Sequence, residues 1–288
     1  MTLAAAVPKS QGIEEYRVVE EPFYLPVGDE VTLFEAAWRE RIPVLLKGPT
    51  GCGKTRFVEY MSWKLARSGD PALPQAPGLP LVTISCHEDL TATDLVGRYL
   101  LSGRGTEWVD GPLTRAVRYG GICYLDEVVE ARKDTIVIIH SLTDHRRLLP
   151  IEKRAEVIPA HSDFLLVVSY NPGYQSTVKD LKHSTRQRFM AIEFNYPSEA
   201  LEMRIIEREA GADRERAAAL ALLGYQIRNL DQQNLLEGPS TRLLIYAGRL
   251  MAQGVAPRLA CETAIAQAMT DDTLLADGVR QVIDAVFR

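Results

Sequence analysis

The chain has 288 residues and a formal net charge of −5; 46% of its residues are hydrophobic and 25% are charged. These fractions are typical of a globular protein and exclude a disordered or fibrous chain. The acidic balance disfavours constitutive binding to nucleic acid or to anionic membranes.

No apolar run approaches the roughly 18 residues that a membrane-spanning helix needs, and no basic region precedes the short apolar stretch after Met1. The four cysteines show neither paired metal-ligand spacing nor a disulfide framework, and they are Cys52, Cys86, Cys123 and Cys261. We therefore expect a reduced, cytoplasmic protein without membrane insertion.

The first 28 residues predict an extended lead-in, followed by a helix through Thr32–Trp38. Five apolar runs then predict strands, at Val44–Leu46, Leu81–Cys86, Ile122–Leu125, Phe164–Tyr170 and Met190–Phe194. A helix follows the first of these strands, because Phe57, Val58, Met61 and Leu65 recur at helical spacing. Near-continuous apolar strands that alternate with helices predict an α/β fold with a parallel sheet covered on both faces.

From Ser198 to the end only helical periodicity is present, with helix boundaries expected at Gly211, Ser240 and Gly254. The sequence therefore predicts three parts: a lead-in at 1–28, an α/β nucleotide-binding domain at 29–197 and a small all-helical lid domain at 198–288.

A glycine-rich loop follows the first predicted strand directly and opens the next helix. Its spacing, Gly48-x-x-x-x-Gly53-Lys54-Thr55, is that of a phosphate-binding loop, in which backbone N–H groups surround the phosphates. Lys54 would neutralise phosphate charge, and the Thr55 hydroxyl would bind Mg²⁺. The alternative, a glycine turn with a surface lysine, does not explain the flanking strand and helix. The residues expected to contact ATP are Gly48, Pro49, Thr50, Gly51, Cys52, Gly53, Lys54, Thr55, Arg56 and Asp126.

Two acids end the strand Ile122–Leu125, where α/β sheets place their ligands. Asp126 would orient the Mg²⁺ shell, partly through water, and Glu127 would polarise the attacking water. A solvated acidic pair after a buried strand is the alternative. Asn171, at the end of the most apolar strand, would hold the same water or contact the γ-phosphate, because its strand is expected beside those of the loop and the acids; an Asn-Pro turn is the less favoured alternative.

Three arginines are further candidates for catalysis. Arg188, with Arg186 as the second choice, would reach the γ-phosphate of a neighbouring subunit, although a solvated basic turn is also compatible with them. Arg242 begins a helix of the C-terminal region, where it would sense phosphate if that region folds over the nucleotide.

Motifs in this order resemble the AAA+ ATPases, and more closely their MoxR branch and its CbbQ/NirQ/NorQ group. The segments that carry the resemblance are Lys47–Phe57, Asp94–Leu101, Trp108–Leu113, Tyr124–Arg132, Leu142–Arg147, Ser169–Ser176 and Ser184–Phe189. The resemblance implies that Asn171 matches sensor 1, Arg188 the arginine-finger region and Arg242 sensor 2. It also implies a pore- or substrate-facing insert at 97–112, in which Trp108 is either a contact or a core residue, and a hairpin at about 144–163.

The same resemblance implies a homo-oligomeric ring, expected to be a hexamer, that remodels a client protein with a von Willebrand factor A-domain (VWA) partner of the CbbO or NorD type. The first expected client is Rubisco, freed of inhibitory sugar phosphates; the alternative is nitric oxide reductase during maturation. Three other functions share parts of the motif set: a nucleic-acid motor, a small-molecule kinase and a non-catalytic binding module. The acidic balance disfavours the motor, and Glu127 disfavours the last two.

Overall fold

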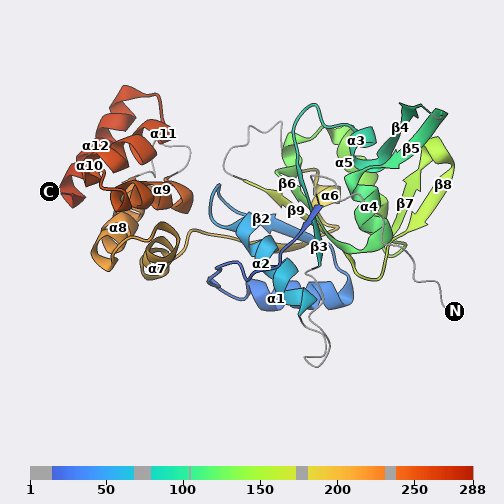
Figure 1. Ribbon diagram of the computed structural model, residues 1–288, viewed down its shortest axis with the longest axis horizontal. Coiled ribbons are helices and arrows are strands. Elements are labelled where there is room, and N and C mark those ends of the chain that lie inside the picture. The colour runs from blue at the N-terminus through green and yellow to red at the C-terminus, as the bar shows by residue number, and fades with distance from the viewer. Residues whose placement is uncertain (1–14, 68–78, 104, 173–180, 231–237, 288) are drawn as a thin grey trace.

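The structure, a computed structural model, describes residues 15–67, 79–103, 105–172, 181–230 and 238–287, which contain ten short strands, twelve α-helices, three 3₁₀-helices and one π-helix (Figure 1). The strands are β1 (Glu15–Arg17), β2 (Val44–Lys47), β3 (Pro80–Ser85), β4 (Gly97–Ser102), β5 (Gly105–Asp110), β6 (Gly121–Asp126), β7 (Leu148–Ile151), β8 (Glu156–Pro159), β9 (Phe164–Tyr170) and β10 (Met190–Glu193). The helices are α1 (Glu30–Glu40), α2 (Lys54–Ala66), α3 (Ala92–Val96), α4 (Pro112–Tyr119), α5 (Lys133–Val137), α6 (His183–Arg186), α7 (Glu199–Ala210), α8 (Arg214–Leu230), α9 (Thr241–Ala252), α10 (Pro257–Cys261), α11 (Gln267–Met269) and α12 (Thr273–Val286).

The central sheet has the strand order β1-β3-β6-β9-β2-β10. Its last five strands are parallel, which confirms the predicted fold, and each overlaps one of the five predicted apolar runs, two of which extend one residue beyond the strand, at Cys86 and Phe194. The first strand, β1, was not predicted; it lies within the lead-in and pairs antiparallel with β3. Strand β9 is buried along its whole length, as expected of a strand at the centre of a sheet covered on both faces.

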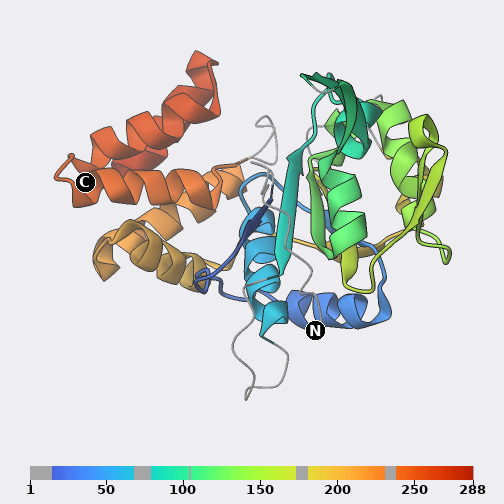
Figure 2. The same cartoon turned by 45° about the vertical axis from the view of Figure 1, so that its right-hand side comes forward.

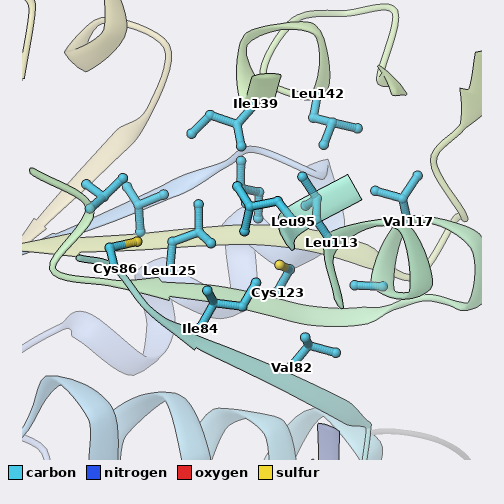
Figure 3. Close-up of a cluster of buried hydrophobic side chains, with 14 of the residues drawn as sticks. Val82, Ile84, Cys86, Leu95, Leu113, Val117, Cys123, Leu125, Ile139 and Leu142 are labelled. Carbon is cyan, nitrogen blue, oxygen red and sulfur yellow. The ribbon is translucent and has the colours of Figure 1, made fainter. Parts of the chain in front are cut away.

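Alternate side chains of each strand enter two separate cores, one on each face of the sheet. On one face Phe34 of α1 and Phe57 of α2 pack edge to face, with ring centroids 5.3 Å apart. On the other face Leu95 of α3 and Leu113 of α4 pack against Cys123 and neighbouring strand residues (Figure 3). Each fully buried Leu or Phe contributes about 1.5–3 kcal/mol through removal of apolar surface from water.

Helices α7–α12, called the lid below, have a third core of their own around Leu220, Leu244 and Met251. Helix α7 ends at Gly211 in the left-handed conformation, Ser240 caps α9, and Gly254 follows α9, as the sequence predicted. The lid lies beyond one end of the sheet, while two hairpins, β4–β5 and β7–β8, lie at the opposite end (Figures 1 and 2). Separate cores on either side of residue 197 support the proposed domain boundary.

Candidate nucleotide site

The glycine-rich loop runs from the end of β2 to the first turn of α2. Gly53 is the N-cap of that helix, with φ 101°, a conformation that glycine adopts without strain. The side chain of Lys54 is buried in the loop, where its Nζ donates hydrogen bonds of 2.7 Å to the carbonyl oxygens of Gly48 and Pro49. A buried ammonium group beside the N-terminal end of a 13-residue helix makes this loop electropositive and suited to phosphate.

The lid contacts the loop at Gly51. A Cβ atom added to Gly51 would lie 2.4 Å from the Cβ of Ser240, and its φ of 68° also favours glycine. Ser240 is the N-cap of α9, and its hydroxyl accepts a hydrogen bond from the backbone N–H of Leu243. The start of α9, including Arg242, is therefore held directly against the phosphate loop.

The two acids lie at the carboxyl end of β6, as predicted. Asp126 Oδ1 accepts hydrogen bonds of 2.6 Å from the hydroxyls of Tyr124 and Ser169. The Tyr124 hydroxyl also contacts that of Ser169, at 3.1 Å, and that of Thr55. Burial, followed by the charge and the hydrogen bond of Asp126, raises the pKa of Tyr124, so this tyrosine stays a donor. Three hydroxyls thus connect Asp126 to the first turn of α2.

Glu127 has a left-handed backbone, with φ 55° and ψ 49°, although it is not glycine. Such a conformation is uncommon for a residue other than glycine and costs about 1–3 kcal/mol. The Glu127 N–H donates to the Ser169 hydroxyl at 3.1 Å, which helps to hold this backbone. The exposed side chain lines the same cavity as Lys54 and Thr55.

Asn171 follows β9, which lies between β6 and β2. Its Nδ2 donates a hydrogen bond of 2.9 Å to Thr50 Oγ1, so the amide lies between the phosphate loop and the acids. Asn171 is buried and is not among the described residues that line the nucleotide cavity, so its contact with phosphate or water stays a prediction. Residues 173–176 of the same motif lie outside the described residues.

The arginine candidates separate into two groups. Arg56 and Arg242 line the cavity, and Arg56 also pairs with Glu209 of the lid at 3.8 Å. Arg186 and Arg188 are not among the described residues that line it. Arg188 is exposed and donates to the carbonyl oxygen of His140 at 3.4 Å, whereas Arg186 is half-buried over the Tyr170 ring at 5.7 Å.

The cavity that joins these groups has a volume of about 560 Å³, within the usual range for small-molecule sites. One wall is the phosphate loop with the two acids, and a second is the lid, through Ile205, Ile245 and Tyr246. The third wall, Phe23–Val27, belongs to the segment predicted only as a lead-in. Its apolar run before α1 is the sequence signal that could have identified it as part of the site.

Glu30 anchors this third wall from the start of α1. Its carboxylate, 6% exposed, accepts hydrogen bonds from the Tyr24 hydroxyl (2.7 Å) and from the N–H groups of Val27 (2.8 Å) and Gly28 (2.7 Å). Burial alone would raise the pKa of Glu30, but these hydrogen bonds outweigh it and lower the pKa below its usual value. The Tyr24 ring in turn stacks on Tyr60 at 5.3 Å.

The donor set of the cavity fits a nucleoside triphosphate. Loop amides, a buried lysine and three arginines (Arg56, Arg242 and Arg249) provide positive charge, and the aromatic and aliphatic walls provide apolar surface. Among the described residues no group of three or more His, Cys, Asp or Glu side chains could hold a metal by itself. Thr55 and Asp126 fit a Mg²⁺ ion that takes its remaining ligands from phosphate and water, as Mg²⁺ commonly does.

Trp108 lies outside this site, on strand β5 of the β4–β5 hairpin, which corresponds to the predicted segment 97–112; the β7–β8 hairpin corresponds to the predicted segment 144–163. The Trp108 ring packs edge to face on Tyr99, lies 5.7 Å from the Arg154 guanidinium and donates a hydrogen bond to Asp110. Trp108 is half-buried and contacts the core, so it serves at least as a packing residue.

Fold and phosphate loop together define an ATPase of the AAA class, and the AAA domain (dynein-related subfamily) family matches residues 43–189. Residues 202–286 match the CbbQ/NirQ/NorQ C-terminal family. The chain therefore belongs to the CbbQ/NirQ/NorQ family of AAA+ ATPases, which confirms the resemblance seen in the sequence.

Relatives within this family are similar over nearly their whole length. Protein CbbQ of Hydrogenophilus thermoluteolus is 54% identical over 273 residues, 95% of this chain and 98% of that one. Protein NorQ of Paracoccus denitrificans is 54% identical over 269 residues, 93% and 95% of the two chains. The denitrification regulatory protein NirQ of Stutzerimonas stutzeri is 51% identical over 268 residues, 93% and 92%. The relatives thus carry different names at similar identity.

Among solved structures, a point mutant of Thermotoga maritima RuvB has a TM-score of 0.51 at 17% identity, covering 90% of this chain and 71% of its own. This likeness supports the fold alone. Within the described residues no helix combines the length and the apolar character required to cross a bilayer. All four cysteines are buried and form no disulfide.

Proposed function

We propose that the cavity binds ATP with Mg²⁺ and hydrolyses it at an interface between subunits of a ring, to remodel a client protein. The observation that carries this proposal is the division of the arginines. Arg56 and Arg242 line the cavity of their own subunit, while the exposed Arg188 lies away from it. A second subunit would bring its Arg188 to the phosphates.

The chain's own residues divide the chemistry among them. Loop amides and Lys54 hold the β- and γ-phosphates, Thr55 and Asp126 hold Mg²⁺, and Glu127 accepts the proton of the attacking water. Asn171 orients that water from the loop side, and Arg242 contacts phosphate from the lid. Bound Mg²⁺ supplies charge neutralisation at the phosphate oxygens.

The proposed client is Rubisco, released from inhibitory sugar phosphates together with a VWA-domain partner of the CbbO type. The 54% identity to protein CbbQ, over 95% of this chain, supports this client. The test mixes sugar-phosphate-inhibited Rubisco, the partner, ATP and this protein, and follows recovery of carboxylation. We expect recovery that requires both ATP and the partner and that is lost with Glu127→Gln.

A second candidate is maturation of nitric oxide reductase with a NorD-type partner, favoured by equal identity to protein NorQ. To test this, the reductase is co-expressed with this protein and that partner, and the amount of active reductase is measured. The Glu127→Gln variant is the control. Active reductase formed only with the wild-type protein, without recovery of Rubisco, would replace the first client by the second. ATPase activity stimulated by DNA, and by neither partner, would contradict both.

We further propose that the Phe23–Val27 wall receives the adenine base, which makes Glu30→Gln a test of that wall. The glutamine keeps the size of the side chain but cannot accept all three hydrogen bonds as a carboxylate does. We expect the KM for ATP to rise roughly three- to tenfold, while inhibition by tripolyphosphate, which has no base, stays unchanged. Glu35→Gln on the same helix is the control.

Acid unfolding provides a second measurement on Glu30. The pKa of Glu30 is lower in the folded state than in the unfolded state, where it is about 4.3. The ionised carboxylate therefore stabilises the fold above the unfolded pKa, and this contribution is lost as the pH falls through the folded pKa. The stability difference between wild type and Glu30→Gln should therefore shrink below about pH 4.

Equal losses of affinity for ATP and for tripolyphosphate in Glu30→Gln would show that Glu30 supports the whole fold and not the base wall.

A further inference from the structure

A buried ion pair in the lid connects two of its helices to the beginning of a third, α9. Arg228 of α8 makes two hydrogen bonds to the Glu202 carboxylate of α7, at 2.7 and 2.8 Å. Their side chains are only 13% and 1% exposed. Burial of both charges carries a large desolvation cost, so such a pair is weak as a source of stability and is better explained by the geometry that it imposes.

The remaining polar atoms of the pair hold the beginning of α9. Arg228 Nε and Nη2 both donate to the Pro239 carbonyl oxygen, at 3.0 and 2.7 Å. The Thr241 hydroxyl donates to Glu202 Oε1 at 2.6 Å. Residues 239–241 are thus fixed just before Arg242, the arginine that lines the nucleotide cavity.

Tyr196 connects the same pair to the phosphate loop. The Arg228 guanidinium lies 3.9 Å from the centre of the Tyr196 ring, which fits a cation–π contact. The Tyr196 hydroxyl lies 3.2 Å from the Thr50 carbonyl oxygen and 3.4 Å from that of Gly238, so its one proton is shared between the loop and the lid. Thr50 is also the residue whose hydroxyl accepts the hydrogen bond from Asn171.

We propose that Tyr196, Arg228 and Glu202 are positioning residues for ATP hydrolysis: they make the position of Arg242 depend on the position of the phosphate loop. When the loop closes on the γ-phosphate, the Thr50 carbonyl moves the Tyr196 hydroxyl, and the ion pair carries that movement to the first turn of α9. This inference rests on the proposed role of Arg242 at the phosphates.

Tyr196→Phe tests the proposal, because it removes only the hydroxyl and leaves the ring beneath Arg228. We expect the kcat for ATP to fall roughly three- to tenfold, the value of one net hydrogen bond. ADP has no γ-phosphate for Arg242 to contact, so its affinity should change less than about twofold. In an Arg242→Ala background, where there is no guanidinium left to position, Tyr196→Phe should have almost no further effect on kcat.

Tyr225→Phe, which removes an exposed hydroxyl from the same helix as Arg228, is the matched control and should leave kcat and the unfolding midpoint unchanged. If the Tyr196→Phe and Arg242→Ala losses multiply in the double variant, the two residues act independently and the proposal is wrong. A large drop in ADP affinity or in the unfolding midpoint of Tyr196→Phe would likewise contradict the proposal, because it would show that Tyr196 stabilises the fold in general. Absence of ATP turnover in the wild-type protein would instead overturn the proposed function.

Discussion

Glu127→Gln is expected to bind ATP and to leave it unhydrolysed. The substitution keeps the shape of the side chain and removes the group that accepts the proton of water, a contribution of about 10²–10⁴-fold to the rate. Lys54 and the loop amides are untouched, so the Kd for ATP should change less than about threefold. Single-turnover hydrolysis and equilibrium binding measure the two quantities separately.

Glu130→Gln makes the same change three residues further along the chain, outside the nucleotide cavity, and should keep hydrolysis within about twofold of wild type. Turnover of Glu127→Gln above roughly a tenth of the wild-type rate would assign water activation to another residue. Loss of ATP binding in this variant would show that Glu127 acts on the fold of the loop.

Arg188→Ala is expected to lose about 10³-fold or more in turnover and to keep ATP binding, because a finger stabilises charge that develops only in the transition state. Arg186→Ala, made in parallel, decides between the two arginines. The exposed side chain of Arg188 is free of the ring contact that holds Arg186 beside Tyr170, and for this reason we expect the larger loss at Arg188.

A mixture of two inactive variants tests whether the finger acts between subunits. Co-expression of Arg188→Ala with Glu127→Gln in equal amounts gives about a quarter of the interfaces an intact Glu127 facing an intact Arg188. We expect turnover to recover to a corresponding fraction of the wild-type rate. No recovery would contradict a shared site, since a finger acting within its own subunit leaves every subunit inactive. Lys182→Ala, which removes an exposed neighbouring cation, is the control and should stay active.

The parts of the site that the sequence predicts are those whose side chains follow strands or glycine turns. Asp126, Glu127 and Asn171 end apolar strands, so the alignment of parallel strands brings them to one edge of the sheet. The walls of the cavity come from elsewhere, and the sequence marks the Phe23–Val27 wall only weakly, by a short apolar run before α1. Phe23–Val27 has neither helical nor strand periodicity and is held by the more distant carboxylate of Glu30.

Contacts between remote parts of the chain were also beyond sequence reasoning. Tyr196 reaches Thr50 across 146 positions, and Glu202 pairs with Arg228 across 26. In the sequence only Thr50, in the phosphate loop, stands out; Tyr196, Glu202 and Arg228 have the ordinary character of residues in a turn or an amphipathic helix. Their meaning depends on how the lid docks, and the docking is determined by three-dimensional packing that periodicity does not encode.

The left-handed backbone of Glu127 has a consequence for how this protein can change over evolutionary time. Its strain of about 1–3 kcal/mol is present in every folded molecule, against a total stability of about 5–15 kcal/mol for a typical domain. Glycine or asparagine would relieve that strain, so selection for heat resistance alone would favour replacing this glutamate. If Glu127 has the proposed role, we expect it to persist only where activity is selected as well, and a stabilised variant without Glu127 should be tested first for loss of ATP hydrolysis.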